Sequence, residues 1–475
     1  MTAHESCTIR ELVNGTVGVP SQELPGILTD SDSGEALHGQ PASGPESVES
    51  ALAAAAAVHD NEVWTGLPDS ERAALMRKLG AELTARAADM AAADSLDSGV
   101  PLTTTSALIP AVCALMEVGA AQIESGFGHT VQESSSGPCD QWRLPWGPAA
   151  VLLPWNASAH MAIVRLSDAL VAGCPVVLKP SEWAPHSSGL LAEAINAALP
   201  PGLVQILHGG REVSQSIVED PRIAAVSFTG GVPGGKGVAE ACARQLKPVD
   251  LELSGNNPVV VLPDADPAEV AAHVVTAMLM LNGQYCVGPR RLIVPDGRVE
   301  EYVGAIAAML DAVPIGASTD AGTALGPISH EPHLQRIAQQ VADFEARGCE
   351  VRRYGQLPAS QGHFAAPTVV LADKAADLQE EVFGPVLLVR TYGDVDEAVA
   401  IANDHAYGLS AYVFGADRDQ ARAVGRRLRA GLVRLNSAFG PPDANPVASV
   451  WGISGIGQIG IGTGPLFFSG GRFVG

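Results

Sequence analysis

The sequence predicts an α/β protein with two successive domains, each built on a parallel sheet. From residue 147 onward, short apolar runs such as "AAVLLP" and "PVVLKP" alternate with helical segments such as "LSDALVAGC" and "SSGLLAEAINAAL". A second alternation begins at "NPVVVLPDAD" and continues through "PAEVAAHVVTAMLMLNGQ" and "RRLIVP". Strands that alternate with helices are typical of βαβ units, whose strands lie parallel. We expect the boundary between the two domains near "LELSGNNP".

Three further segments complete the predicted organisation. Residues 47–97 are rich in alanine, but Leu, Met and Val recur at spacings of three and four, which indicates packed helices. The stretch "IESGFGHTVQESSSGPCDQWRLP" and the tail "GTGPLFFSGGRFVG" fit neither domain, and disorder is one interpretation of both. Apolar side chains in a chain end favour docking on another surface, such as a second subunit.

Composition excludes several classes of function. The chain has 475 residues, is 47% hydrophobic and carries a formal net charge of −23, which disfavours binding to nucleic acid or anionic membranes. No apolar run approaches the roughly 18 residues of a membrane span, and the N-terminus lacks the pattern of a signal peptide, so we expect a cytoplasmic protein. The seven cysteines lack C-x-x-C and the 12 histidines lack H-E-x-x-H, so we expect neither a disulfide framework nor a metal site.

The stretch "FTGGVPGGKG" almost matches a phosphate-binding loop. Gly230, Gly235 and Lys236 fit the pattern G-x-x-x-x-G-K-[ST], but Gly237 stands where a hydroxyl would bind Mg²⁺. Pro233 also removes one backbone N–H from the turn. A glycine-rich turn between a strand and a helix N-terminus suits a phosphate of any kind. These residues alone leave open an ATPase, a dinucleotide site and a structural turn.

Seven short motifs occur along the chain, and their order carries more information than any one of them alone. Four carry polar or reactive residues: "LPWN" (153–156), "VVLKPSE" (176–182), "LELSGNNP" (251–258) and "NGQYCVG" (282–288). Three flank them: "ALGPI", "EEVFGPV" and "YGLSAYVF". From about residue 27 to about residue 457, the chain resembles the aldehyde dehydrogenase superfamily, which is NAD(P)-dependent.

The resemblance implies a fold. It consists of a Rossmann-like dinucleotide-binding domain, an α/β catalytic domain and a small β oligomerisation arm, with a homodimer or homotetramer as the assembly. The corresponding expected ranges are 1–122 and 146–251 for the dinucleotide-binding domain, 252–443 for the catalytic domain, and 123–145 and 444–475 for the arm. The "FTG" turn would then face the pyrophosphate of the cofactor, so the likeness to an ATPase loop is coincidental.

The resemblance also implies three catalytic residues. Cys286 supplies the thiolate that adds to the aldehyde, which otherwise has no alkoxide from which a hydride can leave. Asn156 donates its side-chain N–H to the resulting oxyanion, together with the backbone N–H of Cys286. Glu252 activates the water that releases the acid. From its position between two leucines, Glu252 is either such a base or a salt-bridged structural residue, and we favour the base.

The expected cofactor is NAD, and the resemblance assigns it residues from five motifs. Lys179 and Glu182 would face the adenine ribose, and Glu381 and Phe383 would hold the nicotinamide ribose and ring. The remaining cofactor residues are Trp155, Ser181, Thr229, Gly230, Gly231 and Leu253. For the substrate tunnel we expect Tyr285, directly before the nucleophile, and Phe439.

Some positions depart from the family pattern. Arg165 stands where the family often has a proton-relay lysine, and arginine stays charged and cannot act as a base. Gly231 replaces a serine that could bind the pyrophosphate. We therefore expect a hydrolytic, NAD-dependent aldehyde dehydrogenase acting on a small-molecule aldehyde, with two alternatives. One is an enzyme that passes the acyl group to coenzyme A, which Glu252 disfavours; the other is a catalytically impaired member with a binding or structural role.

Overall fold

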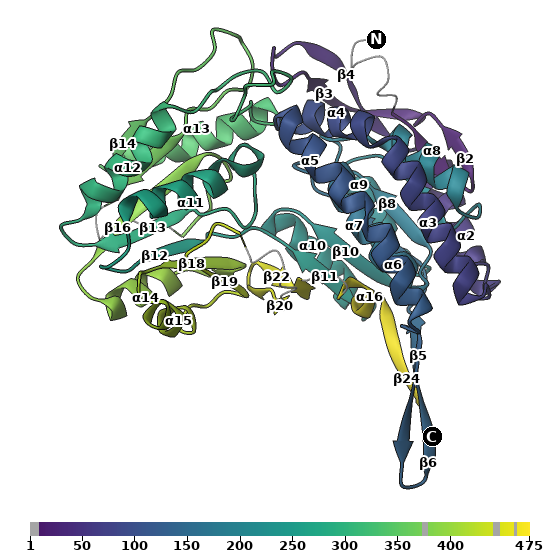
Figure 1. Cartoon of the computed structure of the whole chain (residues 1–475). Helices are drawn as coiled ribbons and strands as arrows, with labels where there is room; N and C mark the ends of the chain where they lie inside the picture. Colours follow the sequence, from purple (N-terminus) through teal and green to yellow (C-terminus); the bar gives the residue numbers. More distant parts are fainter. Residues whose placement is uncertain (1–8, 373–378, 440–446, 460–462) are drawn as a thin grey trace.

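The structure, a computed structural model, describes residues 9–372, 379–439, 447–459 and 463–475. It has two large sheets, each covered by helices, and a thin arm of strands that projects from the body (Figure 1). The two alternations of strand and helix in the sequence correspond to these two sheets.

The first sheet has eight strands in the order β2-β1-β9-β8-β7-β10-β11-β22. Its five central strands are parallel: β7 (Ala149–Leu152), β8 (Val176–Lys179), β9 (Val204–Ile206), β10 (Ala225–Thr229) and β11 (Val249–Glu252). Antiparallel strands complete the edges: β1 (Glu11–Val13), β2 (Thr16–Gly18) and β22 (Gly455–Ile456). Among the parallel strands, the chain passes from β7 outward through β8 to β9. It then returns, so that β10 lies on the other side of β7. This reversal is the kind of switch point at which dinucleotides bind.

Helices cover both faces of the first sheet, which explains why β7, β8 and β9 are buried at every residue. One face packs on α7 (Ser158–Ala172) and α8 (Ser188–Ala198). The other packs on α2 (Pro45–Asp60), α9 (Arg211–Glu219) and α10 (Val232–Ala243). Alternate residues of β7 lie in the two cores, as the twofold period of a strand requires.

The alanine-rich N-terminal region is helical, as predicted. It contains α3 (Asp69–Ala85) and α4 (Ala87–Ser98), followed by α5 (Leu102–Cys113) and α6 (Leu115–Glu124). The run Leu102–Glu124, with a mean hydropathy of 1.6, is long and apolar enough by length and composition to cross a membrane, which corrects the expectation that no run approaches that length. Side chains of both helices, such as those of Ile109 and Met116, lie in the first core, as in a core helix of a globular protein.

The second sheet has seven strands in the order β14-β15-β16-β13-β12-β18-β19, all parallel to their neighbours except β14. The strands are β12 (Pro258–Val261), β13 (Arg291–Pro295), β14 (Glu350–Arg353), β15 (Thr368–Leu371), β16 (Val386–Tyr392), β18 (Ser410–Phe414) and β19 (Leu432–Leu435). The covering helices are α11 (Pro267–Leu279) and α12 (Val299–Asp311) on one face, and α13 (Glu331–Ala346), α14 (Val395–Asn403) and α15 (Arg418–Gly425) on the other.

The arm consists of β5 (His129–Ser134), β6 (Gly137–Pro145) and β24 (Ser469–Val474), in the order β24-β6-β5. The C-terminal strand thus docks on the hairpin, while Phe468 just before it is fully buried in the first core. Residues 444–475 were expected to belong to the arm, but β22, which lies in this range, joins the first sheet. The expected boundary at 443/444 lies outside the described residues. The smaller elements are β3 (Gln22–Thr29), β4 (Ala36–Ala42), η1 (Met280–Gly283), β17 (Tyr407–Gly408), β20 (Ala448–Ser449), β21 (Trp451–Gly452), β23 (Gln458–Ile459) and α16 (Gly464–Phe467).

Candidate active site

Four of the residues expected in catalysis and cofactor binding lie at the carboxyl ends of four neighbouring parallel strands. Asn156 follows β7, Glu182 follows β8, Gly231 follows β10, and Glu252 is the last residue of β11. Because these strands are parallel and adjacent in the sheet, their ends meet at one edge. This edge of a doubly wound sheet is where ligands bind.

The nucleophile loop "NGQYC" has an unusual backbone. Leu281, Asn282 and Gly283 have φ values of 51°, 59° and 76°, in the left-handed region. This region costs a non-glycine residue about 1–2 kcal/mol, and such strain concentrates at functional sites. Gly283 is required for a second reason, because a Cβ there would lie 2.3 Å from backbone atoms of Gly384 and Pro385. The loop that carries Cys286 is therefore packed tightly against the loop "EEVFGP".

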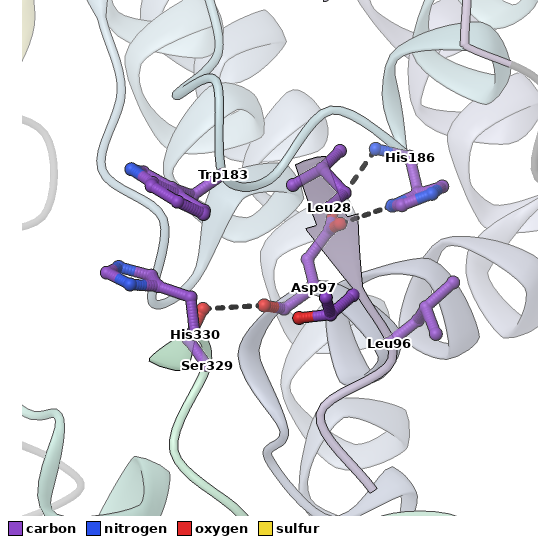
Figure 2. Close-up of a pocket in the computed structure, with 8 residues that line it drawn as sticks. Leu28, Leu96, Asp97, Trp183, His186, Ser329 and His330 are labelled. Carbon is purple, nitrogen blue, oxygen red and sulfur yellow. Dashed lines mark hydrogen bonds and ion pairs between the residues drawn. The ribbon is translucent and has the colours of Figure 1, made fainter. Parts of the chain in front are cut away.

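Side-chain hydrogen bonds hold this strained loop in place. The Asn282 amide donates to the carbonyls of Gly99 and Pro327, at 2.7 and 2.8 Å. The Gln284 amide oxygen accepts from the backbone N–H of Ser329 at 2.9 Å. Figure 2 shows the next link, in which the Ser329 hydroxyl donates to the carbonyl of Asp97 at 2.7 Å. The loop is thus fixed to the end of α4 and to the segment that leads into α13.

Two asparagines bracket the nucleophile. The Asn156 amide donates to the carbonyl of Gln284 at 2.7 Å, which uses one of its two N–H groups. The Asn257 amide donates to the carbonyls of Cys286 and Gly288, at 2.8 and 2.7 Å. The sequence prediction named Asn156 and missed Asn257, although Asn257 lies in the quoted motif "LELSGNNP". Both contacts orient the backbone around Cys286.

The thiol of Cys286 is in its protonated form at neutral pH. Burial raises its pKa to about 12, and the negative charges of Glu252 and Glu381 act in the same direction. The backbone N–H of Val287 and the charge of Arg290 oppose this shift only in part. Glu252 and Glu381 are thus close enough to Cys286 for their charges to act on its thiol, while their roles in catalysis and cofactor binding stay predictions.

Glu252 is ion-paired in this structure. Its Oε1 atom accepts from the guanidinium of Arg165, on α7. The same guanidinium lies 3.1 Å from the carboxylate of Asp250 and 3.7 Å from that of Asp168. The sequence left open whether Glu252 is a base or a salt-bridged residue, and the structure adds that it has a salt-bridge partner at the site itself.

Glu381 forms a second buried ion pair, with Arg290. Their side chains are 5% and 1% exposed, and 3.5 Å separates the Arg290 Nε atom from a carboxylate oxygen. Burial raises the pKa of Glu381, although Arg290 lowers it. Arg290 also donates to the carbonyls of Gly283 and Tyr285, at 2.8 and 2.9 Å, so it joins the nucleophile loop to the "EEVFGP" loop.

An aromatic cluster joins the two domains beside these loops. The rings of Trp155 and Phe383, both expected at the cofactor, lie 5.7 Å apart. His333 lies 4.9 Å from Trp155 and bonds to the Phe383 carbonyl at 2.7 Å, while His330 stacks on Trp183 at 4.1 Å. Burial lowers the pKa of His330 to about 3 and of His333 to about 4, so both are neutral. Neither histidine was predicted as a site residue from the sequence, although two histidines three residues apart in "SHEPH" could have indicated a shared position near the site.

The residues after β8 form a compact polar turn. Lys179 donates to the carbonyls of Pro180 and Gly209, at 2.9 and 2.6 Å, and its ammonium lies 3.9 Å from the carboxylate of Glu182. Burial lowers the pKa of Lys179 to about 8, with Glu182 opposing the shift. Ser181 accepts from the backbone N–H of Trp183 at 3.3 Å. Glu182 is the most accessible of the expected ribose residues, with a side chain 32% exposed.

The glycine-rich turn lies directly before α10. Thr229 pairs with Glu252 in the sheet, and the N–H of Gly230 bonds to the Glu252 carbonyl at 3.1 Å. Gly231 is the residue that precedes α10, so this turn has the helix N-terminus that a phosphate site needs. Leu253 is buried, and a Cβ at Gly235 would lie 2.5 Å from its side chain. Leu253 therefore sets how closely α10 approaches β11.

The two residues expected at the substrate lie in different environments. Tyr285 packs with Cys286 against the buried residues Val287, Leu409 and Val450. Phe439 is 40% exposed and does not belong to that cluster. The structure thus places Tyr285 beside the nucleophile, and the place of Phe439 in the substrate tunnel stays a prediction.

The fold and these side chains define an α/β oxidoreductase with a nucleotide-binding sheet and a cysteine between its domains. Comparison with known proteins agrees, because residues 27–468 match the model of the aldehyde dehydrogenase family. Among curated relatives, geranial dehydrogenase of Castellaniella defragrans is 34% identical, with 87% of each chain aligned. Phenylacetaldehyde dehydrogenase of Pseudomonas fluorescens is 32% identical, over 85% of this chain and 83% of its own.

Solved structures show the same likeness. A mutant of aldehyde dehydrogenase C from Pseudomonas syringae, crystallised with NAD⁺ and octanal, superimposes with a TM-score of 0.91 at 29% identity, covering 99% of this chain and 97% of its own. The chain therefore belongs to the aldehyde dehydrogenase family, and it is an NAD-dependent enzyme that oxidises aldehydes. This confirms the family, the fold class and the cofactor expected from the sequence.

Proposed function

We propose that this enzyme converts an apolar aldehyde to a free carboxylic acid through a thioester on Cys286. The observation that carries this proposal is that two residues from other elements, Asn156 and Glu252, act on the loop and on the thiol of Cys286. Asn156 contacts the backbone two residues before Cys286, and the charge of Glu252 acts on the thiol.

The first half of the reaction forms the covalent adduct. The thiol proton passes to a nearby carboxylate, and the sulfur of Cys286 then bonds to the aldehyde carbon while the carbonyl electron pair moves to oxygen. The second N–H of Asn156 and the backbone N–H of Cys286 donate to that oxyanion, and each such donor lowers the barrier by about 3 kcal/mol. NAD supplies the acceptor for the hydride that leaves the carbon, and this two-electron oxidation leaves a thioester on Cys286.

The second half releases the acid. Glu252 takes a proton from water, the water oxygen bonds to the thioester carbon, and the C–S bond breaks to return the thiolate of Cys286. In the structure the Oε1 atom of Glu252 accepts from Arg165, so the strength of that ion pair affects how freely the carboxylate reaches the water. A free acid, rather than an acyl-coenzyme A, is the product that a positioned Glu252 favours.

The residues present fit NAD. The turn at Gly230 and Gly231 precedes the 12-residue helix α10, whose first N–H groups suit a pyrophosphate. The partly exposed carboxylate of Glu182, three residues after β8, suits a ribose hydroxyl and repels a 2′-phosphate. Trp155 and Phe383 supply aromatic surface beside the ion pair of Glu381, where the nicotinamide half would be held.

The substrate class follows from the surroundings of the nucleophile. Cys286 and Tyr285 pack with Leu432 against the buried apolar residues Val287, Leu409 and Val450. Apolar walls of this kind favour an apolar aldehyde over a charged one. Some relatives are named for geranial and phenylacetaldehyde, and one was crystallised with octanal. Others, at 31–32% identity, are named aminoaldehyde dehydrogenases, so the proposal of an apolar substrate depends on the walls of the site.

The assembly and the location are also part of this proposal. The arm exposes apolar side chains at Val131, Trp142, Phe473 and Val474, between 39% and 62% exposed, which suits a homodimer or homotetramer. The cysteines of the described residues are free thiols, as in a reducing cytoplasm.

A panel of aldehydes tests this function. NADH formation would be measured with octanal, geranial, phenylacetaldehyde and a cationic aminoaldehyde, and the product identified with and without coenzyme A. We expect NADH and free acid, with kcat/KM for the apolar aldehydes at least about tenfold above that for the cation. NADH from none of them would overturn the proposal, and an acyl-coenzyme A product would identify the acyl-transferring type instead.

A further inference from the structure

Arg165 lies among three carboxylates at the edge of the active site. Its Nη2 atom contacts both the Oε1 atom of Glu252 and, at 3.1 Å, the Oδ2 atom of Asp250. Its Nη1 atom lies 3.7 Å from the Oδ2 atom of Asp168. The side chains of Arg165, Asp250 and Asp168 are 6%, 2% and 15% exposed. One buried cation is thus shared by three acidic groups, of which the mechanism uses only Glu252.

Among the residues that the structure describes, no further charged group acts on the two aspartates of the cluster. The charges that act on Asp168 belong to Arg165, Asp250 and Glu252, and those that act on Asp250 belong to Arg165 and Glu252. From β10, the Ser227 hydroxyl donates to Asp250 at 3.3 Å. The C-terminal segment contributes glycines, since a Cβ at Gly457 would lie 2.0 Å from Asp250 and a Cβ at Gly464 would lie 1.9 Å from Asp168.

The protonation of the two aspartates changes near neutral pH. Burial raises the pKa of Asp168 to about 7 and that of Asp250 to about 6, although the charge of Arg165 opposes both shifts. Burial also lowers the pKa of Arg165, but the three carboxylates outweigh it and the net shift is upward, so the guanidinium remains charged. The number of ionised partners around Arg165 therefore depends on pH.

We propose that Asp250 and Asp168 are positioning residues that compete with Glu252 for Arg165, and so control how firmly the guanidinium holds the base. This inference rests on the proposed function, in which Glu252 activates water. Asp250 and Glu252 contact the same Nη2 atom, so an ionised Asp250 shares that cation and loosens its hold on Glu252. When Asp250 is neutral, Glu252 is the principal anion bound to Nη2. A carboxylate bound more firmly to arginine is less free to approach the water that attacks the thioester.

The sign of the pH effect follows from the raised pKa values. Below about pH 6 both aspartates are protonated, Arg165 binds Glu252 most strongly, and thioester hydrolysis is slow. As the pH rises through their pKa values, both aspartates ionise and share Arg165. Hydrolysis of the thioester therefore accelerates between about pH 5 and pH 8. The rate of hydride transfer does not depend on the ionisation of these two aspartates.

Asp250→Asn and Asp168→Asn test the inference, because each keeps the shape of the side chain and removes its charge. With an aldehyde that the wild-type enzyme oxidises, stopped-flow measurement would record the NADH burst and the steady rate that follows it. We expect a burst of wild-type amplitude in both variants, and a steady rate at least about threefold lower in Asp250→Asn with a weaker rise between pH 5 and 8. In Asp168→Asn the steady rate should fall by a smaller factor, because the carboxylate of Asp168 is 3.7 Å from Arg165.

Asp94→Asn is the matched control. Asp94 is another buried carboxylate that contacts α7, where it accepts from the backbone N–H of Ala159 at 2.9 Å, and burial raises its pKa to about 7. It does not contact Arg165, so its replacement should leave the ratio of burst to steady rate and the pH profile as in the wild type. This separates competition for Arg165 from a general weakening of the fold.

The outcomes separate this inference from the proposed function. If neither Asp250→Asn nor Asp168→Asn alters the steady rate or its pH profile, the competition for Arg165 is wrong while the proposed function stands. If the wild-type enzyme forms no NADH from any aldehyde of the panel, the proposed function fails and this inference fails with it. If Asp250→Asn does not fold, the competition for Arg165 can be tested with Asp168→Asn alone, because Asp168 is partly exposed. Asp168→Glu keeps the negative charge, so it should restore the wild-type pH profile.

Discussion

Arg290 lies 3.5 Å from the carboxylate of Glu381, and both side chains are almost completely buried. The guanidinium also lies 5.6 Å from the centre of the Phe383 ring. This pair connects the residue just before β13 of the second sheet with the "EEVFGP" loop, which carries Phe383 into the aromatic cluster. A buried charge without its partner is costly, so the pair has a measurable structural consequence.

We expect Arg290→Met to lower the free energy of unfolding by about 3–5 kcal/mol, because it leaves Glu381 as an uncompensated buried charge. Urea denaturation measures this change. The control is Arg427→Met, which removes an exposed ion pair with Asp396 and should cost about 0–1 kcal/mol. Equal losses in the two variants would show that the buried pair contributes no more than a surface pair.

Cys286→Ala should abolish aldehyde oxidation, because the sulfur forms the covalent adduct. Binding of NAD⁺, measured by calorimetry, should remain, since other residues hold the cofactor. Cys349→Ala, which alters a half-buried thiol between α13 and β14, is the control and should keep wild-type turnover. Turnover of more than a few per cent in Cys286→Ala would contradict the covalent mechanism.

Glu252→Gln should separate the two halves of the reaction, because it keeps the shape of the side chain and removes the base. Stopped-flow should show one NADH per site followed by very slow turnover, and mass spectrometry should find the acyl group on Cys286. Glu240→Gln, on the exposed face of α10, should behave as the wild type. An unchanged steady rate in Glu252→Gln would mean that Glu252 is structural and that another group activates water.

The raised pKa of Cys286 predicts a pH dependence of its reactivity in the enzyme without cofactor. A thiol with a pKa of about 12 has very little thiolate at neutral pH, so the thiolate fraction rises about tenfold for each pH unit. Alkylation of Cys286 by iodoacetamide, followed by mass spectrometry, should therefore accelerate from pH 7 to pH 10 without a plateau. A plateau near pH 8 to 9 would indicate an ordinary thiol and would contradict the influence of burial and of the two carboxylates.

Glu182 should make the enzyme prefer NAD⁺ over NADP⁺ in kcat/KM by at least about tenfold, the equivalent of about 1.4 kcal/mol. Its carboxylate repels a 2′-phosphate, and the ammonium of Lys179 already contacts two carbonyls and Glu182 itself. Glu182→Ser should narrow the preference mainly by improving the use of NADP⁺. A wild-type preference for NADP⁺ would place Glu182 away from the ribose.

The alternation of strands and helices in the two sheets, and the polar residues at the strand ends, could be predicted from the sequence. Alternation of apolar runs is a local property, so β7 to β9 and β12 to β13 could be read from a few neighbouring residues each. The motifs that contain Asn156, Glu252 and Cys286 identified the family for the same reason, since each motif is a short local pattern in a fixed order.

Which of these groups contact one another could not be predicted from the sequence. Arg165 and Glu252 are 87 residues apart, and no spacing in the sequence indicates that one guanidinium contacts Glu252, Asp250 and Asp168 together. The position of His333 between Trp155 and Phe383 likewise depends on how the two domains pack. Ion pairing, ring contact and pKa depend on distances and burial between separate elements, and these are set when the two sheets and their helices assemble.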